Sequence, residues 1–305
     1  MQLVRTRRRH LSGTELIDAT DACPICGATE TRSGSVRLQR DPDVVLLVCP
    51  RCRGASASHM PRAAVLERYY ATYYDGHERE VTIANPAQLA RRIVRTLPRA
   101  AFGERVRILD FGGGDGSVAT AVAATSIAHG PARFAEIVVV DFAERPPRTS
   151  ATIAVRHQSP EAPLDGTFDL VLASAVLEHI PELQRVLRML YAHIGVRGFF
   201  YARTPYALPL VRVWPSFDLG YPAHVHDLGS GFWNRVGTTF GWQLETIASR
   251  PSPVAASLRA DPLRAIAAAL LKMPASLENR LSPRARRDRW WNLVGGWEVL
   301  LQRRA

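Results

Sequence analysis

The sequence contains almost no lysine, because Lys272 is the only lysine among 39 basic residues in a chain of 305. The net charge of +11 and the isoelectric point near 10.2 therefore come almost entirely from arginine. A basic chain ordinarily suggests a nucleic-acid partner. Arginine in place of lysine, in a chain rich in alanine, is instead typical of a biased genome, so the charge alone does not identify a nucleic-acid-binding protein.

Long apolar runs are also missing. No run approaches the roughly 20 residues that span a bilayer, and the basic residues near the start, 1–13, are not followed by the apolar stretch of a secretory signal. The sequence has no internal repeats and no low-complexity linker. We therefore expect a cytoplasmic protein, and its length allows one core of ordinary size with room for an appended module.

Cysteine is scarce, and its four copies are paired. Cys23 and Cys26 form one C-x-x-C pair, and Cys49 and Cys52 form a second. Two such pairs can close a tetrahedral Zn²⁺ site that has no open position, which predicts structural zinc. Disulfides are the alternative, which a cytoplasmic setting disfavours. Because the residues between the pairs read as a hairpin, we expect a small zinc ribbon within residues 1–62.

A glycine-rich turn follows the apolar strand expected at 107–111. Glycine lets the backbone approach a ligand closely and point N–H groups at it. Asp110 and Asp115 would repel a pyrophosphate but attract an ammonium or sulfonium group, and the G-x-G-x-G spacing differs from the dinucleotide fingerprint G-x-G-x-x-G. The turn therefore predicts a site for S-adenosylmethionine. Its expected cofactor-binding residues are Asp110, Gly112, Gly113, Gly114 and Gly116.

A second apolar strand, at 136–142, ends in Asp141, whose carboxylate can accept hydrogen bonds from both hydroxyls of a ribose. We expect Asp141 and its neighbour Phe142 to contact the cofactor. The alternative is an ordinary strand–turn–helix crossover in which Asp141 is merely solvated.

The segment 168–181 resembles the fourth strand and the following loop of the class I S-adenosylmethionine-dependent methyltransferases. Together with the two strands above, it extends the resemblance to this family over residues 105–250 and to the last strand, 296–305. The resemblance implies an α/β fold with a Rossmann-like seven-stranded sheet over 101–305. It implies that Ser174 and Val176 line the cofactor, and 177–181 match the variant L-E-H-x-P. Where relatives often carry an acid that contacts adenine, this chain has His157 and Gln158.

Residues 63–78 resemble the tyrosine-rich segment that follows the ribbon in bacterial methyltransferases with two C-x-x-C pairs. This implies that 63–100 is a helical linker or lid over the cofactor and that Tyr74 contacts the cofactor. The aromatic spacing fits core packing equally well. A helix at 85–97 is indicated by Asn85 as N-cap and Pro86 at its first position.

Methyl transfer from a sulfonium needs mainly positioning, and only a weakly acidic acceptor needs a base. Three histidines are candidates for that base: His179, His224 and His226, with Tyr206 as a weaker one. We favour His224, because family members often carry a histidine just before the helix that follows it. The alternative is that all three are packed or solvated residues.

We therefore expect methyl transfer to oxygen or carbon of a small molecule, such as a sugar, a nucleotide-linked intermediate or a secondary metabolite. Arginine clusters would suit an anionic handle on that molecule, although such clusters are usually solvated. An RNA base methyltransferase is the runner-up, disfavoured because no [DN]-P-P-[FY] motif follows the fourth strand. A zinc-ribbon interaction protein on a degenerate fold is the third possibility. Residues 251–290 form an insertion with a helix near 261–273, suited to a lid, a partner surface or a membrane contact.

Overall fold

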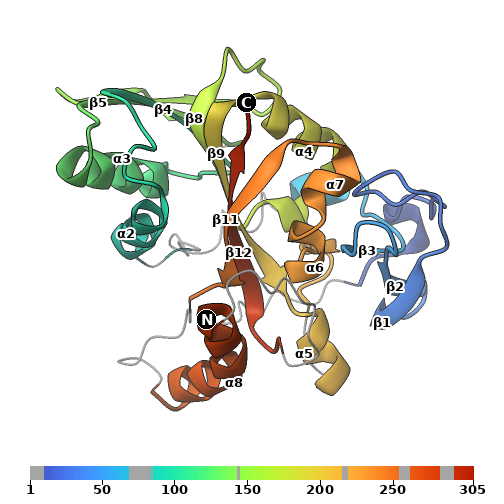
Figure 1. Ribbon diagram of the computed structural model, residues 1–305. Coiled ribbons are helices and arrows are strands. Elements are labelled where there is room, and N and C mark those ends of the chain that lie inside the picture. The colour runs from blue at the N-terminus through green and yellow to red at the C-terminus, as the bar shows by residue number, and fades with distance from the viewer. Residues whose placement is uncertain are drawn as a thin grey trace.

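The computed structural model of the chain describes residues 10–68, 83, 85–142, 145–214, 219–253, 262–281 and 292–305. At its centre is a mixed sheet of eight strands in the order β11-β12-β9-β8-β4-β5-β7-β6 (Figure 1). The strands are β4 Arg105–Phe111, β5 Phe134–Val140, β6 Arg148–Thr149, β7 Ile153–Gln158, β8 Phe168–Ser174, β9 Ile194–Tyr206, β11 Leu244–Pro251 and β12 Gly295–Arg303. The predicted Rossmann-like sheet of seven strands is confirmed, and the short β6 extends it at one edge.

Helices cover both faces of this sheet. They are α2 Pro86–Thr96, α3 Ser117–His129, α4 Leu183–Ala192, α5 Leu208–Val213, α6 Ser230–Trp233, α7 Val236–Phe240 and α8 Pro262–Leu281. The first two helices pack on one face, and α4 and α6 pack on the other (Figure 1). In β4, Ile108 belongs to one core and Leu109 to the other, and both are fully buried. Burial on both faces explains why this strand reads as an almost continuous apolar run.

The predicted start of α2 is confirmed. The Asn85 side chain accepts a hydrogen bond of 2.9 Å from the backbone N–H of Gln88, and Pro86 occupies the first helical position. The cap satisfies a donor that the first turn would otherwise leave without a partner.

A second, smaller sheet carries the cysteine-bearing segment. Its order is β1-β2-β3-β10, in which β1 is Ser33–Gln39, β2 is Val44–Val48 and β3 is Ala55–Ala57. The first two strands form the predicted antiparallel hairpin. The fourth strand, β10 His226–Asp227, comes from the far side of the proposed boundary at residue 62. The small sheet thus contains residues from both sides of that boundary.

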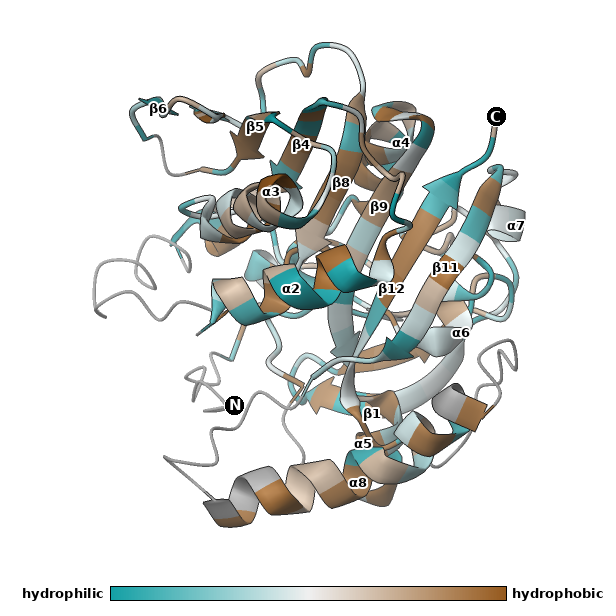
Figure 2. Cartoon of the chain, turned by 60° about the vertical axis from the view of Figure 1, so that its left-hand side comes forward, coloured by the Kyte–Doolittle hydropathy of each residue, from teal (hydrophilic) through white to brown (hydrophobic). Residues whose placement is uncertain are grey.

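The two flanking regions are only partly described. Residues 63–68 are helical, whereas Tyr74 lies outside the described residues. Helix α8 continues eight residues beyond the predicted end at 273, and hydrophobic residues occur along its length (Figure 2). Several of their side chains are exposed, those of Leu263 and Leu281 by more than 80%. Within the described ranges, no helix combines the length and the apolar character that crossing a bilayer requires.

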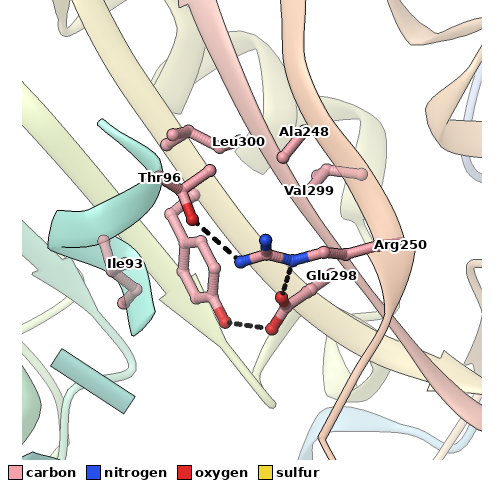
Figure 3. Close-up of a pocket in the computed structure, with 8 residues that line it drawn as sticks. Ile93, Thr96, Ala248, Arg250, Glu298, Val299 and Leu300 are labelled. Atoms are coloured by element: carbon pink, nitrogen blue, oxygen red, sulfur yellow. Dashed lines mark hydrogen bonds and ion pairs between the residues drawn. The ribbon is translucent and has the colours of Figure 1, made fainter. Parts of the chain in front are cut away.

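A polar cluster joins α2 to the neighbouring strands β9, β12 and β11 of the sheet. Glu298 of β12 is 1% exposed and accepts hydrogen bonds from Arg92 Nε at 2.6 Å, Arg250 Nε at 2.5 Å and Tyr201 Oη at 3.2 Å. Arg250 also donates to Thr96 Oγ1, so a small pocket between α2 and β11 is bridged by this network (Figure 3). Every charge in the pocket has a partner, which is typical of a structural site rather than of a binding site.

Replacing Glu298 with alanine should therefore destabilise the fold. Two guanidinium groups and a buried hydroxyl would lose their acceptor, which we expect to lower the free energy of unfolding by about 2–4 kcal/mol. The control is Glu245→Ala, which removes an exposed ion pair with Arg304 and should cost less than about 0.5 kcal/mol. Urea denaturation of both variants is the measurement, and equal midpoints would contradict the structural role of Glu298.

Candidate functional site

The glycine-rich turn between β4 and α3 is tightly packed on the protein side and open at its tip. Gly112, Gly114 and Gly116 have φ values of 68°, 57° and 70°, which disfavour any residue with a side chain. A Cβ atom at Gly112 would lie 2.3 Å from Val176 Cγ2, whereas one at Gly114 would meet nothing within 4 Å. The backbone therefore approaches open space at Gly114, as a ligand cradle requires.

Asp110 and Asp141 end neighbouring strands beside this turn, as predicted. Asp141 Oδ2 accepts a hydrogen bond of 2.8 Å from the backbone N–H of Gly114, which ties the turn to the end of β5. Asp110 is 3% exposed, and its Oδ2 atom has no hydrogen-bond partner within the described part of the chain. Burial raises the pKa of Asp110 to about 7. Such a carboxyl suits a ligand with a cationic group, because a positive charge favours its ionised form.

Three of the remaining predicted cofactor residues, Ser174, Val176 and Phe142, are described by the structure, whereas Tyr74 is not. Val176 packs against Gly112, and the buried Ser174 Oγ atom lacks a partner among the described residues. Phe142 is 79% exposed. At the end of β7, both ring nitrogens of His157 lack partners in the described chain, and burial together with Arg148 and Arg145 lowers its pKa. A neutral His157 therefore offers one donor and one acceptor on this side of the turn.

The structure brings His179 and His224 together. Their ring centroids are 4.7 Å apart, and His179 Nε2 lies 3.9 Å from a carboxylate oxygen of Glu178. Coordinating atoms of Glu178, His179 and His224 all lie within 4.8 Å of one another. His179 and Glu178 come from the short helix η2 Leu177–His179 after β8, and His224 from the loop before β10.

Backbone carbonyls fix the two rings. His179 Nδ1 lies 2.9 Å from the oxygen of Ala223, and His224 Nδ1 lies 3.0 Å from the oxygen of Leu219. A carbonyl only accepts, so each Nδ1 carries the proton and each Nε2 keeps its lone pair. Gly220, with φ 78°, allows this arrangement, because a Cβ there would approach His224 Nδ1 to 3.0 Å.

His226 lies apart from this pair. It is 2% exposed, its Nδ1 is 3.0 Å from Ser56 Oγ, and its Nε2 is 2.8 Å from the oxygen of Ile180. Burial lowers its pKa to about 4. Both ring nitrogens therefore link β3 to the end of η2 within the protein, unlike those of His179 and His224, and the role of His226 as a base stays a prediction.

Sequence reasoning did not assign Glu178 to the site. Its side chain is 2% exposed, and its Oε2 atom has no hydrogen-bond partner in the described ranges. Burial raises the pKa of Glu178 to about 8 and, together with His224, lowers that of His179 to about 3. One signal in the sequence could have identified Glu178. It directly precedes the candidate base His179 and follows a central parallel strand, where functional residues of α/β folds are common.

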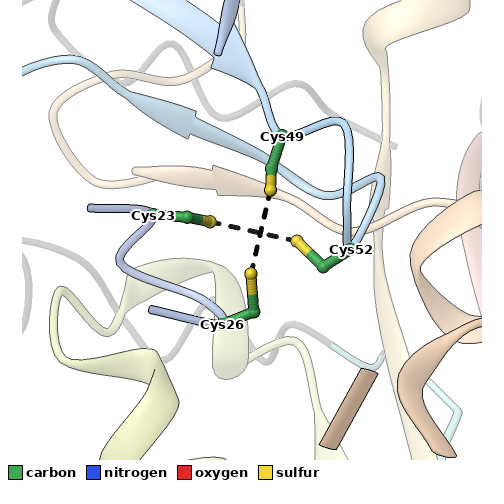
Figure 4. Close-up of side chains that lie close together, drawn as sticks. All are labelled: Cys23, Cys26, Cys49 and Cys52. Atoms are coloured by element: carbon green, nitrogen blue, oxygen red, sulfur yellow. Dashed lines mark hydrogen bonds between the residues drawn. The ribbon is translucent and has the colours of Figure 1, made fainter. Parts of the chain in front are cut away.

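The Sγ atoms of the four cysteines point toward one another and all lie within 4.8 Å of one another (Figure 4). The Sγ atoms of Cys23 and Cys52 are 3.9 Å apart, and those of Cys26 and Cys49 are 3.7 Å apart. A disulfide would need about 2.05 Å, whereas four sulfurs placed ~2.3 Å from a central ion are about 3.8 Å apart. The neighbouring thiols of Cys23 and Cys26, together with burial, raise the pKa of Cys52, so four thiolates here need a cation between them.

Comparisons with known proteins agree with this geometry. Residues 82–246, more than half of the chain, match the family described as "Methyltransferase domain". No curated protein matches the sequence significantly. Similar solved structures include the YcgJ protein of Bacillus subtilis, with 17% identity, coverage of 72% of this chain and 99% of the other, and a TM-score of 0.44.

Two further structures were solved with S-adenosylhomocysteine. Magnesium protoporphyrin IX methyltransferase of Synechocystis PCC 6803 has 13% identity, covers 79% of this chain and 95% of its own, and has a TM-score of 0.42. The N-methyltransferase NodS of Bradyrhizobium japonicum WM9 has 10% identity, 79% and 97% coverage, and a TM-score of 0.41. The family match, joined to the strand order and to the glycine turn beside Asp110 and Asp141, shows that the chain belongs to the methyltransferase-domain family and is an S-adenosylmethionine-dependent methyltransferase.

Proposed function

We propose that this enzyme methylates an oxygen or carbon atom of a small molecule that binds beside Glu178, His179 and His224. The observation that carries the proposal is the closeness of this polar cluster to the cofactor turn. Val176, which packs on Gly112, precedes Glu178 by two residues. An acceptor held at the cluster would therefore lie next to a ligand held at the turn.

The cofactor supplies a methyl group on a sulfonium, which is already a good leaving group, so the protein has to orient the acceptor and remove its proton. We assign orientation of the cofactor to the turn 112–116, Asp110, Ser174 and Val176, with Asp141 on the ribose. Phe142 and Tyr74 remain proposed contacts. His224, supported by His179, is the proposed general base, because its Nε2 carries the lone pair.

Several arginines of the basic chain are engaged within the protein. Arg92 pairs with Glu298, Arg107 pairs with Glu136, and Arg148 donates to the backbone oxygen of Asp115. These three arginines therefore have roles within the fold and do not need a nucleic-acid partner to explain them. This supports a small-molecule acceptor over RNA.

We also propose that the cysteine cluster binds one structural Zn²⁺. The sulfur geometry fits a closed four-coordinate site, and in the reducing cytoplasm that we propose for this enzyme the thiols would stay reduced. The site would then join the turn before β1 to the turn between β2 and β3.

The zinc proposal predicts stoichiometric release of metal by a thiol reagent. Titrating the four cysteines with a mercurial, and following zinc with a chromogenic chelator, should liberate one zinc per four modified thiols. Release should be accompanied by loss of structure in residues 20–57, because a metal-bound fold depends on its metal. Four reactive thiols with less than about half an equivalent of released zinc would contradict the site.

For the cofactor site, Asp141→Ala should weaken binding of S-adenosylhomocysteine by about 30-fold, since the ribose would lose its acceptor at a cost of ~2 kcal/mol. Glu161→Ala, which changes an exposed acid, is the control and should bind like the wild type. Calorimetry measures both variants. Equal affinity for Asp141→Ala and the wild type would remove Asp141 from the cofactor site.

For the proposed base, His224→Ala should reduce turnover by roughly 10²–10⁴-fold while S-adenosylhomocysteine affinity stays within about twofold of the wild type. His129→Ala, at the exposed end of α3, should keep full turnover. The acceptor is first identified by screening small molecules and ribosomal RNA for transfer of a radiolabelled methyl group. If His224→Ala keeps more than half of the wild-type rate, His224 is not the general base. If RNA alone is methylated, the acceptor is not a small molecule.

A further inference from the structure

We propose that Glu178, His179 and His224 form a binding site for a divalent transition-metal cation, separate from the cysteine cluster. The three side chains place their coordinating atoms within 4.8 Å of one another, and Glu178 Oε1 and His179 Nε2 are only 3.9 Å apart. Ligand atoms around one such cation, at ~2.0–2.2 Å from it, are about 3–4 Å apart. Small rotations of the side chains would bring these three atoms to that spacing.

The orientation of both imidazoles matches what metal ligation requires. A metal-bound histidine usually donates its other ring N–H to a carbonyl or carboxylate, which fixes the ring and its tautomer. Here His179 Nδ1 and His224 Nδ1 are held by the carbonyl oxygens of Ala223 and Leu219, at 2.9 and 3.0 Å. Coordination would therefore use Nε2 of each ring.

The carboxylate gives a second, independent indication. Glu178 is 2% exposed, and its Oε2 atom has no hydrogen-bond partner within the described residues. A buried carboxylate without such a partner is costly unless a cation or a donor meets it. Arg203 already favours the ionised form of Glu178 from a distance, and a divalent ion beside His179 would meet its oxygen directly.

The donor set also indicates the class of ion. Two imidazoles and one carboxylate suit Zn²⁺, Fe²⁺, Co²⁺ or Mn²⁺ and leave coordination positions open, whereas four thiolates close a zinc site completely. The two sites therefore differ in chemistry and can be loaded and measured separately.

The consequence for catalysis rests on the proposed function, although binding of the ion does not. A hydroxyl of the acceptor that occupies an open position would have a lowered pKa, as for other metal-bound hydroxyl groups. A ring nitrogen that coordinates the ion cannot accept a proton at the same time. In the metal-bound state the histidines would act as ligands, and ionisation of the acceptor by the cation, with loss of the proton to solvent, would replace proton transfer to His224.

The test is titration of the purified, zinc-containing enzyme with Co²⁺ and, separately, with Mn²⁺. We expect one equivalent of Co²⁺ to bind with a visible d–d spectrum that lacks thiolate charge-transfer bands, and Mn²⁺ to show nitrogen hyperfine coupling in pulsed EPR. His224→Ala and His179→Ala should weaken binding at least tenfold, as should Glu178→Gln. His129→Ala should bind like the wild type.

Absence of Co²⁺ and Mn²⁺ binding to the folded wild type, or binding without nitrogen coupling, would overturn the site. These wild-type results decide the matter even if a variant fails to fold, which circular dichroism reveals. Metal binding without methyl transfer to any acceptor would instead contradict the proposed function alone. Methyl transfer at full rate by an enzyme that binds no added metal would leave the proposed function intact and remove the cation site.

Discussion

The pairing of two residues of β10 with β3 is the constraint on which the candidate site depends. His226 lies opposite Ser56 and Asp227 lies opposite Ala55. The side chains reinforce the pairing, because His226 bonds to both Ser56 and the carbonyl of Ile180, and Asp227 Oδ2 accepts from two backbone N–H groups at the start of α5. The loop before β10 is thereby held against η2, where the backbone N–H of Val225 donates to the oxygen of Glu178. His224 consequently lies beside His179.

This arrangement couples the cysteine cluster to the candidate site. Cys23, Cys49 and Cys52 belong to the same hydrophobic core as Leu228 and Phe232, next to β10. Gly54, between Cys52 and β3, allows this packing, because a Cβ there would lie 2.6 Å from Ile25. A ribbon packed in this way is not an independent appendage. If the cysteines hold the zinc that we propose, its loss would loosen β3, then β10, and through them the loop that carries His224.

The sequence predicted the features that depend on neighbouring residues. The glycine turn, the cap at Asn85 and the hairpin of β1 and β2 each have a local signal, and each forms as expected. The roles of His224 and His226 could not be separated in this way. Two residues apart, they would share a face in an extended strand, but His224 sits in the turn closed by Gly220 and only His226 lies in β10. A strand of two residues has no periodic signal, and Ser56, the partner of His226, lies 170 residues away in the sequence. The same long-range pairing brings His224 to Glu178, so the sequence did not indicate that Glu178 belongs to the site.

Three of the four carboxyl residues buried in the described chain, Glu298, Asp110 and Glu178, show how the structure separates stability from function. Glu298 accepts hydrogen bonds from two arginines and a tyrosine, so its charge is balanced within the protein. Asp110 lies near the end of β4, and Glu178 follows the adjacent strand β8. Each has a carboxylate oxygen without a hydrogen-bond partner in the described chain. Native proteins rarely leave such oxygens unpaired. Both lie at the carboxyl edge of the sheet, where α/β folds bind their ligands, so cationic ligands are the natural complement: the sulfonium-bearing cofactor near Asp110 and, by our inference, a metal ion at Glu178.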